Sequence, residues 1–191
     1  MKLVTAHQIA LLPWNGFIHK FLLSDEFIVM DNTQFRARSF MHRTHIEVNG
    51  LPLWVTWPIQ DAKKNWIIKD LRFVQSPALA DWLLVTFKKL RHAYSKNEHW
   101  ESVAEYFHSI ISLVETRPFA TPLDIFCHFL EYLKAKANSD VKILIESEFS
   151  EASYSDPTTR LLSHIQECKP DVYIMGANSI NYFEFHRNDF D

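Results

Sequence analysis

Hydrophobic residues in the first part of the chain form two short runs separated by one helical stripe. The runs are Leu3–Ala6 and Phe27–Met30, and each is followed directly by polar side chains. Between them, apolar residues recur with the i, i+3, i+4, i+7, i+8 spacing of one helix face: Trp14, Phe17, Ile18, Phe21 and Leu22. The pattern predicts strand, helix, strand, with the two strands paired in parallel through a right-handed crossover.

Polar side chains stand at the expected carboxyl ends of both strands. They are His7, Gln8, Asp31, Asn32 and Gln34. In a parallel crossover unit, ligands bind beyond the carboxyl ends of the strands, so these groups are candidates for proton transfer, amide recognition or metal binding. The same residue types also cap strands and form turns, and both interpretations stay open at this point.

An antiparallel hairpin is predicted after the second strand. Asn49-Gly50 lies between two β-prone runs, Ile46–Val48 and Leu53–Trp57, and both turn residues accept a positive φ. Pro58 ends the second run, because proline cannot donate a hydrogen bond to a ladder. Farther along, residues 67–74 are predicted to be an extended segment.

The rest of the chain has a helical middle and an alternating tail. Apolar periodicity and prolines at helix starts predict three helices between about residues 77 and 138. The tail then favours strand, helix, strand over Val141–Ile145, Asp156–Cys168 and Val172–Met175. We therefore expect a single α/β domain over residues 1–191, with a Rossmann-like parallel-containing sheet, an N-terminal β-hairpin and a helical insertion or cap.

Composition and charge exclude several classes of protein. Hydrophobic residues make up 47% of the chain and aromatic residues 14%, which argues against intrinsic disorder. The net charge of −3 argues against a general nucleic-acid binder, and three glycines are too few for a glycine-rich phosphate loop. No signal peptide or membrane-spanning run is evident, and Cys127 and Cys168 follow no disulfide pattern. We expect a cytoplasmic protein with reduced thiols.

An ordered set of motifs spans most of the chain. Its first part consists of His7-Gln8, Leu12-Pro13-Trp14-x-Gly16-Phe17, Lys20, Ser24-Asp25, Asp31, Gln34, Arg43 and Trp54-Val55-Thr56-Trp57-Pro58-Ile59. Its last part consists of Arg160-Leu161-Leu162 and Tyr173-Ile174-Met175-Gly176-Ala177-x-x-x-x-Tyr182. Together these motifs resemble the WbqC-like protein family, and the chain departs from the pattern of that family at Ile9, Phe40 and His42.

The resemblance implies a role in O-antigen or related surface-polysaccharide biosynthesis. The activity proposed for the family is transfer of glycine to a sugar, so the resemblance implies an aminoacyl or acyl transferase. Its substrate would be a small sugar, for example a nucleotide-linked amino sugar, and its donor would be activated by a nucleotide or another carrier. The cofactor requirement stays unknown, and the sequence is compatible with an oligomer.

Such a transfer needs a base near the acceptor and hydrogen-bond donors for the developing oxyanion. His7 is the candidate base, because a strand end can hold it rigidly at a cleft, and Asp31 would orient its imidazole or bind a metal. Gln8 and Gln34 are candidate polar contacts to the substrate. His42-x-x-His45 lacks partnered cysteines, so we expect no metal site there.

The start of the first helix and an arginine-rich loop offer candidate anion sites. The backbone amides of Asn15 and Gly16 can bind phosphate, and Arg36, Arg38 and Arg43 can add cationic forks. The predicted substrate-binding set is completed by Trp14, Lys20, Asn32 and Gly176. A tryptophan on a helix face is also typical of a core, and an arginine loop is also typical of a solvated turn.

Two other functions stay open. The order strand, glycine turn, helix, strand is also typical of nucleotidyltransferase-like enzymes, which activate substrates by adenylation. Gly16 fits that pattern, although Phe17 follows it and His19 is displaced from the position of a second motif histidine. A non-catalytic binding or assembly protein of the same pathway would instead tolerate substitution of His7 and Asp31.

Overall fold

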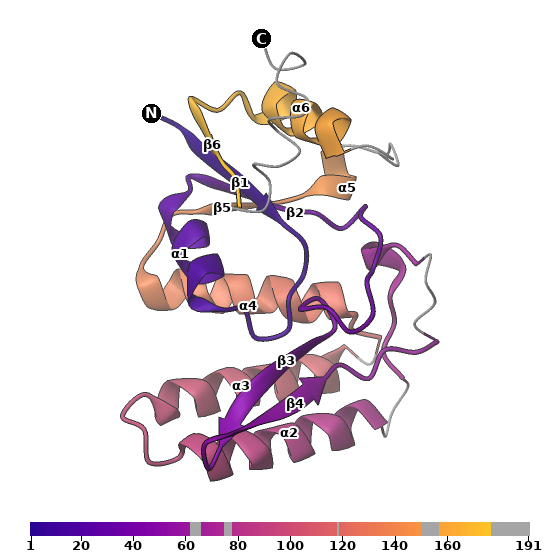
Figure 1. The fold of residues 1–191 in the computed structure, drawn as a ribbon, viewed down its shortest axis with the longest axis vertical. Helices are drawn as coiled ribbons and strands as arrows, with labels where there is room; N and C mark the ends of the chain where they lie inside the picture. The colour runs from indigo at the N-terminus through magenta and orange to yellow at the C-terminus, as the bar shows by residue number, and fades with distance from the viewer. Residues whose placement is uncertain (62–65, 75–77, 118, 150–156, 177–191) are drawn as a thin grey trace. The chain divides into compact units, whose positions relative to one another are not determined.

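The computed structural model describes residues 1–61, 66–74, 78–117, 119–149 and 157–176 (Figure 1). Its chain divides into two compact units. The first unit comprises Met1–Gln8, Pro13–Thr33 and Lys134–Asp191, and the second comprises Ile9–Leu12 and Gln34–Leu133.

The first unit is built on a four-stranded sheet in the order β5-β2-β1-β6, in which all three neighbouring pairs are parallel. Its strands are β1 (Leu3–His7), β2 (Glu26–Val29), β5 (Lys142–Ile145) and β6 (Val172–Ile174). The predicted parallel pairing of the first two strands is confirmed. In the register of the sheet, His7 lies opposite Val29, and Val29 lies opposite Ile145.

Helices cover both faces of this sheet. Figure 1 shows α1 (Asn15–Leu23) on one face and α6 (Pro157–Cys168) on the other. The connection from β1 to β2 and the connection from β5 to β6 run in opposite directions across the sheet. Connections between parallel strands are almost always right-handed, and two right-handed connections that run in opposite directions place their helices on opposite faces.

Aromatic packing holds α1 against the sheet. The rings of Phe17 and Phe21 meet the ring of Phe27 edge to face, with centroids 5.4 and 5.1 Å apart, and all three side chains are buried. The helix ends at Ser24, whose backbone N–H and hydroxyl both donate to the carbonyl of Phe21. Phe17 and Phe21 of the predicted apolar stripe therefore face the sheet, whereas Trp14, at the N-cap of α1, is exposed.

The second unit contains an antiparallel hairpin, β3 (Arg43–Val48) with β4 (Leu51–Thr56). Asn49 and Gly50 connect its strands with φ values of 53° and 79°, which confirms the predicted turn. Between β4 and β5 the chain forms three long helices, α2 (Ala78–Tyr94), α3 (Trp100–Thr116) and α4 (Pro122–Ala137). These helices agree with an α/β fold that carries a helical middle.

Some predicted elements differ from the structure. Residues 67–74 contain the 3₁₀ helix η1 (Ile68–Asp70) instead of a continuous strand. Ile67 and Phe73 form isolated bridges with two different segments, so no ladder extends between them. The short helix α5 (Glu146–Phe149) was not predicted. The predicted helix starts near residue 77 and at Asp156 lie outside the described residues.

Among the described residues, no helix combines the length and the apolar character that crossing a membrane would require.

We expect Phe21→Ala to lower the free energy of unfolding by about 3 to 5 kcal/mol, because it empties a fully buried aromatic site. The matched control on the same helix is His19→Ala, whose exposed side chain should contribute less than about 0.5 kcal/mol. Urea unfolding followed by circular dichroism measures both. Equal effects of the two substitutions would contradict the observed packing of α1.

Candidate functional site

The carboxyl edge of the parallel sheet gathers the polar residues of the first unit. β1 ends at His7, β2 leads into Asp31 and Asn32, and β5 leads directly into Glu146. Since the strands are parallel and in register, these strand ends emerge at one edge. The backbone N–H of Met30 donates to the carbonyl of His7 (2.9 Å), which extends the ladder to the end of both strands.

His7 lies on the face of the sheet that α1 covers. Its ring contacts Trp14 and Phe17 edge to face, at centroid distances of 5.4 and 5.0 Å. Nδ1 lies 2.8 Å from the carbonyl oxygen of Gln8 and must donate to it, because a carbonyl only accepts. Burial lowers the pKa of His7 to about 4, so at neutral pH the ring is uncharged and Nε2 carries a lone pair.

Lys20 of α1 lies beside this histidine. Its Nζ donates to the carbonyl of Ala6 (2.9 Å), the residue that precedes His7 in β1. Burial lowers the pKa of Lys20 to about 8, and the positive charge of Lys20 contributes to the lowered pKa of His7. The end of β1 therefore combines a neutral imidazole with an ammonium group at neutral pH.

Asp31 is buried at the end of β2, with only 1% of its surface exposed. Its two carboxylate oxygens accept hydrogen bonds from the backbone N–H (2.9 Å) and the hydroxyl of Ser147. These bonds join the end of β2 to the first turn of α5. In the structure, Nδ1 of His7 donates to the carbonyl of Gln8 and not to Asp31. The role of Asp31 as the orienter of His7 therefore stays a prediction.

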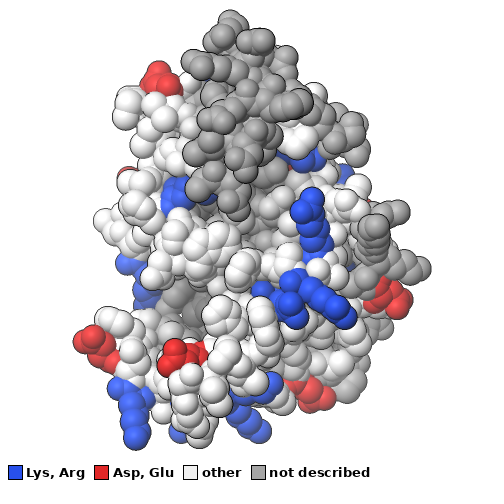
Figure 2. All heavy atoms as spheres, viewed as in Figure 1, with Lys and Arg blue, Asp and Glu red and all other residues white. Residues whose placement is uncertain are grey.

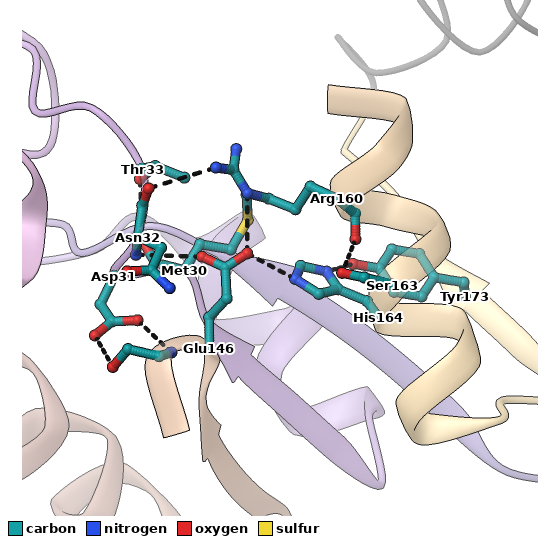
Figure 3. Close-up of polar contacts among 10 residues, drawn as sticks. Met30, Asp31, Asn32, Thr33, Glu146, Arg160, Ser163, His164 and Tyr173 are labelled. Atoms are coloured by element: carbon teal, nitrogen blue, oxygen red, sulfur yellow. Dashed lines mark hydrogen bonds and ion pairs between the residues drawn. The ribbon is translucent and has the colours of Figure 1, made fainter. Parts of the chain in front are cut away.

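A second polar centre lies on the opposite face of the sheet, under α6 (Figure 3). Glu146, which is fully buried, forms an ion pair through Oε1 with Nε of Arg160 (2.9 Å) and accepts on the same oxygen from Nε2 of His164 (2.9 Å). Its Oε2 accepts from the backbone N–H of Asn32 (3.2 Å). The other ring nitrogen of His164, Nδ1, lies 3.0 Å from the hydroxyl of Tyr173. The network thus connects α6 with the ends of β2 and β5 and with β6.

Charge pairing explains why a carboxylate can be buried here. An isolated buried carboxylate would cost several kcal/mol, and this cost is offset only when cationic and hydrogen-bonding partners are well placed. Arg160 provides the positive charge, and its terminal nitrogen also approaches the carbonyl of Asn32 (3.4 Å). Figure 3 shows its side chain extending from α6 towards the residues that follow β2. His164 is 1% exposed, which identifies the network mainly as a sealed support of this edge.

The other predicted residues of the first unit lie around the start of α1 and the strand ends. Trp14 is 45% exposed, Asn15 and Gly16 are exposed in the first turn, and Gly176 is exposed beyond β6. A Cβ atom at Gly16 would lie 3.2 Å from Nε1 of Trp14, so a side chain there would press against the indole. The core interpretation of Trp14 is therefore wrong, and the indole remains a candidate contact for substrate.

Gln34, Arg38 and Arg43 belong to the second unit. Gln34 forms a bridge with Ile67. Nε of Arg43 donates to the carbonyl of Arg38 (3.1 Å), and its guanidinium lies 4.1 Å from the ring centroid of Trp54. Figure 2 shows basic side chains gathered over the segment that precedes β3. Gln34, Arg38 and Arg43 thus belong to a different unit from His7, and their predicted contact with substrate stays a prediction.

Sequence reasoning missed Glu146, Ser147, Arg160 and His164 as members of this edge. For Glu146 and Ser147 a signal was present, because they follow a predicted strand just as Asp31 follows its strand. Arg160 and His164 stand four positions apart, which places them on one face of α6. Within the described ranges, no group of three or more His, Cys, Asp or Glu side chains is arranged to hold a metal ion.

Comparison with known proteins agrees with the motifs at both ends of the chain. The sequence profile of the WbqC-like protein family matches residues 8–191. The chain belongs to the WbqC-like family. It is also similar to the uncharacterized protein Rv1507c of Mycobacterium tuberculosis, with 24% identity over 192 residues that cover 96% of this chain and 76% of the relative. No solved structure gives a significant match.

We expect Glu146→Gln to lower the free energy of unfolding by about 3 kcal/mol, because it leaves the Arg160 cation without its buried counter-charge. Glu148→Gln is the matched control, since Glu148 lies on the same short helix but is exposed. It should change stability by less than about 0.5 kcal/mol. Urea unfolding measures both. If Glu146→Gln left the free energy of unfolding unchanged, the ion pair between Glu146 and Arg160 would not be supporting the fold.

His7 should make the protein less stable in acid. Its pKa is about 4 in the folded protein and 6.5 in the unfolded chain, so between these values the unfolded state binds more protons. Stability should therefore fall as the pH drops from 6.5 to 4, with a contribution from His7 on the order of 3 kcal/mol. Unfolding curves of His7→Gln across this range should lose that slope. The exposed His19→Gln variant should keep it.

Proposed function

We propose that this WbqC-like protein is a cytoplasmic transferase that adds a glycyl, other aminoacyl or acyl group to a sugar intermediate of surface-polysaccharide biosynthesis. Family membership supports the pathway. The observation that carries the chemistry is the imidazole of His7, held at the carboxyl end of β1 by its Nδ1 bond to Gln8. This bond directs the proton to Nδ1 and leaves Nε2 as the basic atom.

In the proposed reaction, His7 acts as the general base. Nε2 accepts a proton from the amine or hydroxyl of the acceptor sugar while that group attacks the carbonyl carbon of the donor. An amide or ester bond forms, and the bond to the leaving group of the donor breaks. The lowered pKa of His7 supports this role, because the ring stays unprotonated throughout the neutral range.

The remaining predicted contacts would bind the two substrates. The start of α1 has no side-chain cap, so the amides near Asn15 and Gly16 suit a phosphate of a nucleotide-linked substrate. The exposed indole of Trp14 would lie against a sugar ring. Further polar contacts are proposed for Gln8, Asn32 and Gly176 of the first unit. For Gln34, Arg38 and Arg43, which belong to the second unit, contact with substrate stays a prediction from the sequence. Asp31 would act by fixing the strand end through Ser147.

The test is incubation with nucleotide-activated amino sugars and candidate activated glycyl or acyl donors, read by mass spectrometry. We expect a mass increase of the sugar that equals the transferred group. His7→Ala should lower the rate by about 100-fold or more, as loss of a general base does. The exposed His19→Ala variant should keep the wild-type rate. Full activity of His7→Ala would contradict the assignment of the base.

The uncapped start of α1 also favours a second candidate, an adenylating nucleotide-binding enzyme. A ligand that binds only the folded state raises the melting temperature, so thermal shift assays can separate the two enzymes. A shift with ATP alone favours adenylation, and a shift with the nucleotide sugar favours transfer. Unchanged function in both His7→Ala and Asp31→Ala would instead favour a non-catalytic pathway protein.

A further inference from the structure

Lys20 has a more specific position than a general substrate contact would need. It lies one helical turn after Phe17, on the face of α1 that packs on the sheet. Its ammonium group is held by the carbonyl of Ala6, which belongs to the rigid ladder of β1. His7, the next residue in β1, contacts the same helix through Phe17. One strand end and one helix thus fix the positions of both nitrogen groups.

The surroundings of the two groups favour opposite proton states. Burial lowers both pKa values, to about 4 for His7 and about 8 for Lys20, so in the neutral range His7 is free of its proton while Lys20 retains one. The groups around the imidazole are the carbonyl of Gln8, which follows β1, Trp14 at the N-cap of α1, Phe17 and Lys20 from α1, and Val29 on β2. Asp31, which follows the neighbouring strand β2, is bonded to Ser147. Two titratable groups separated in this way are suited to act as base and acid.

We propose that Lys20 is the general acid of the transfer, acting together with His7 as the general base. This inference rests on the proposed function. Nε2 of His7 takes the proton of the attacking amine or hydroxyl as the new bond to the donor carbonyl carbon forms. When the bond from that carbon to the leaving group breaks, Nζ of Lys20 gives its proton to the departing atom. The protonated His7 then returns a proton to Lys20 through solvent, so both groups regain their starting states.

This role also indicates the chemical class of the donor. A phosphate leaving group departs as a stable anion and gains little from an acid. A thiolate is the anion of a weaker acid, with an unperturbed thiol pKa of about 8.5, and it gains more when Nζ of Lys20 protonates it. We therefore assign the donor to the thioesters, with acyl phosphates as the contrasting class.

Transfer rates of Lys20→Arg and Lys20→Met give the first test, with the glycyl thioester of N-acetylcysteamine and with glycyl phosphate as the two donors. Arginine keeps the positive charge and can still donate to Ala6, but it does not release its proton. With the thioester, both variants should lose about 100-fold in rate, and the wild-type rate should fall above about pH 8. With glycyl phosphate, Lys20→Arg should stay within about threefold of wild type.

Lys88→Met on α2 is the matched control, because Lys88 is exposed, and it should keep the wild-type rate with both donors. Urea unfolding of each variant shows whether it is folded. The inference is overturned if folded Lys20→Arg transfers from the thioester within about threefold of the wild-type rate, since Lys20 would then act only through its charge or its bond to Ala6.

The second test measures the protonation of Lys20 without any transfer reaction. Competitive labelling with acetic anhydride over a pH series, followed by peptide mass spectrometry, gives the pH of half-maximal acetylation for each lysine. We expect a value near 8 for Lys20, well below the ordinary lysine pKa of about 10.4. A value for Lys20 near the ordinary one would overturn the inference. A wild-type protein that shows the low value for Lys20 but transfers no group to any sugar would instead refute the proposed function.

Discussion

Parallel hydrogen bonding between β1 and β2 is the constraint on which the rest of the first unit depends. The register pairs His7 with Val29, and the bond from Met30 to the carbonyl of His7 extends it to the strand ends. Because β5 continues the same register on β2, Glu146 also reaches this edge. A slip by one residue would move each side chain of the strand to the other face. The positions of His7 and Glu146 thus follow from main-chain geometry before any side-chain contact is made.

The two faces of the sheet use their polar residues in different ways. On the α1 face, His7 and Lys20 are bonded mainly to backbone carbonyls, and both have lowered pKa values. On the α6 face, Glu146 and His164 are sealed inside an ion-paired network. A group that must exchange protons with a substrate needs a basic or acidic atom that is not already committed, whereas a supporting group is most stable when each of its atoms is paired. This difference favours the α1 face as the place of the chemistry.

Much of the fold followed from local patterns. The stripe from Trp14 to Leu22 became α1, and Asn49-Gly50 became the turn of the hairpin, because helix periodicity and positive φ depend on nearby residues only. The extended segment expected at residues 67–74 failed for the opposite reason. A strand needs a partner ladder, and Ile67 and Phe73 find two different partners, so a 3₁₀ turn forms between them.

The sequence by itself determined the elements, the parallel pairing of the first two strands, the hairpin and the residues that end the strands, because each of these is encoded within about thirty neighbouring positions. Only the tertiary structure decided what those residues contact. Asp31 bonds to Ser147, 116 positions away in the chain, and Glu146 is paired with residues of α6. The lowered pKa values of His7 and Lys20 come mainly from burial where α1 packs on the sheet. Burial and ion pairing depend on which distant segments pack together, and no local pattern specifies that.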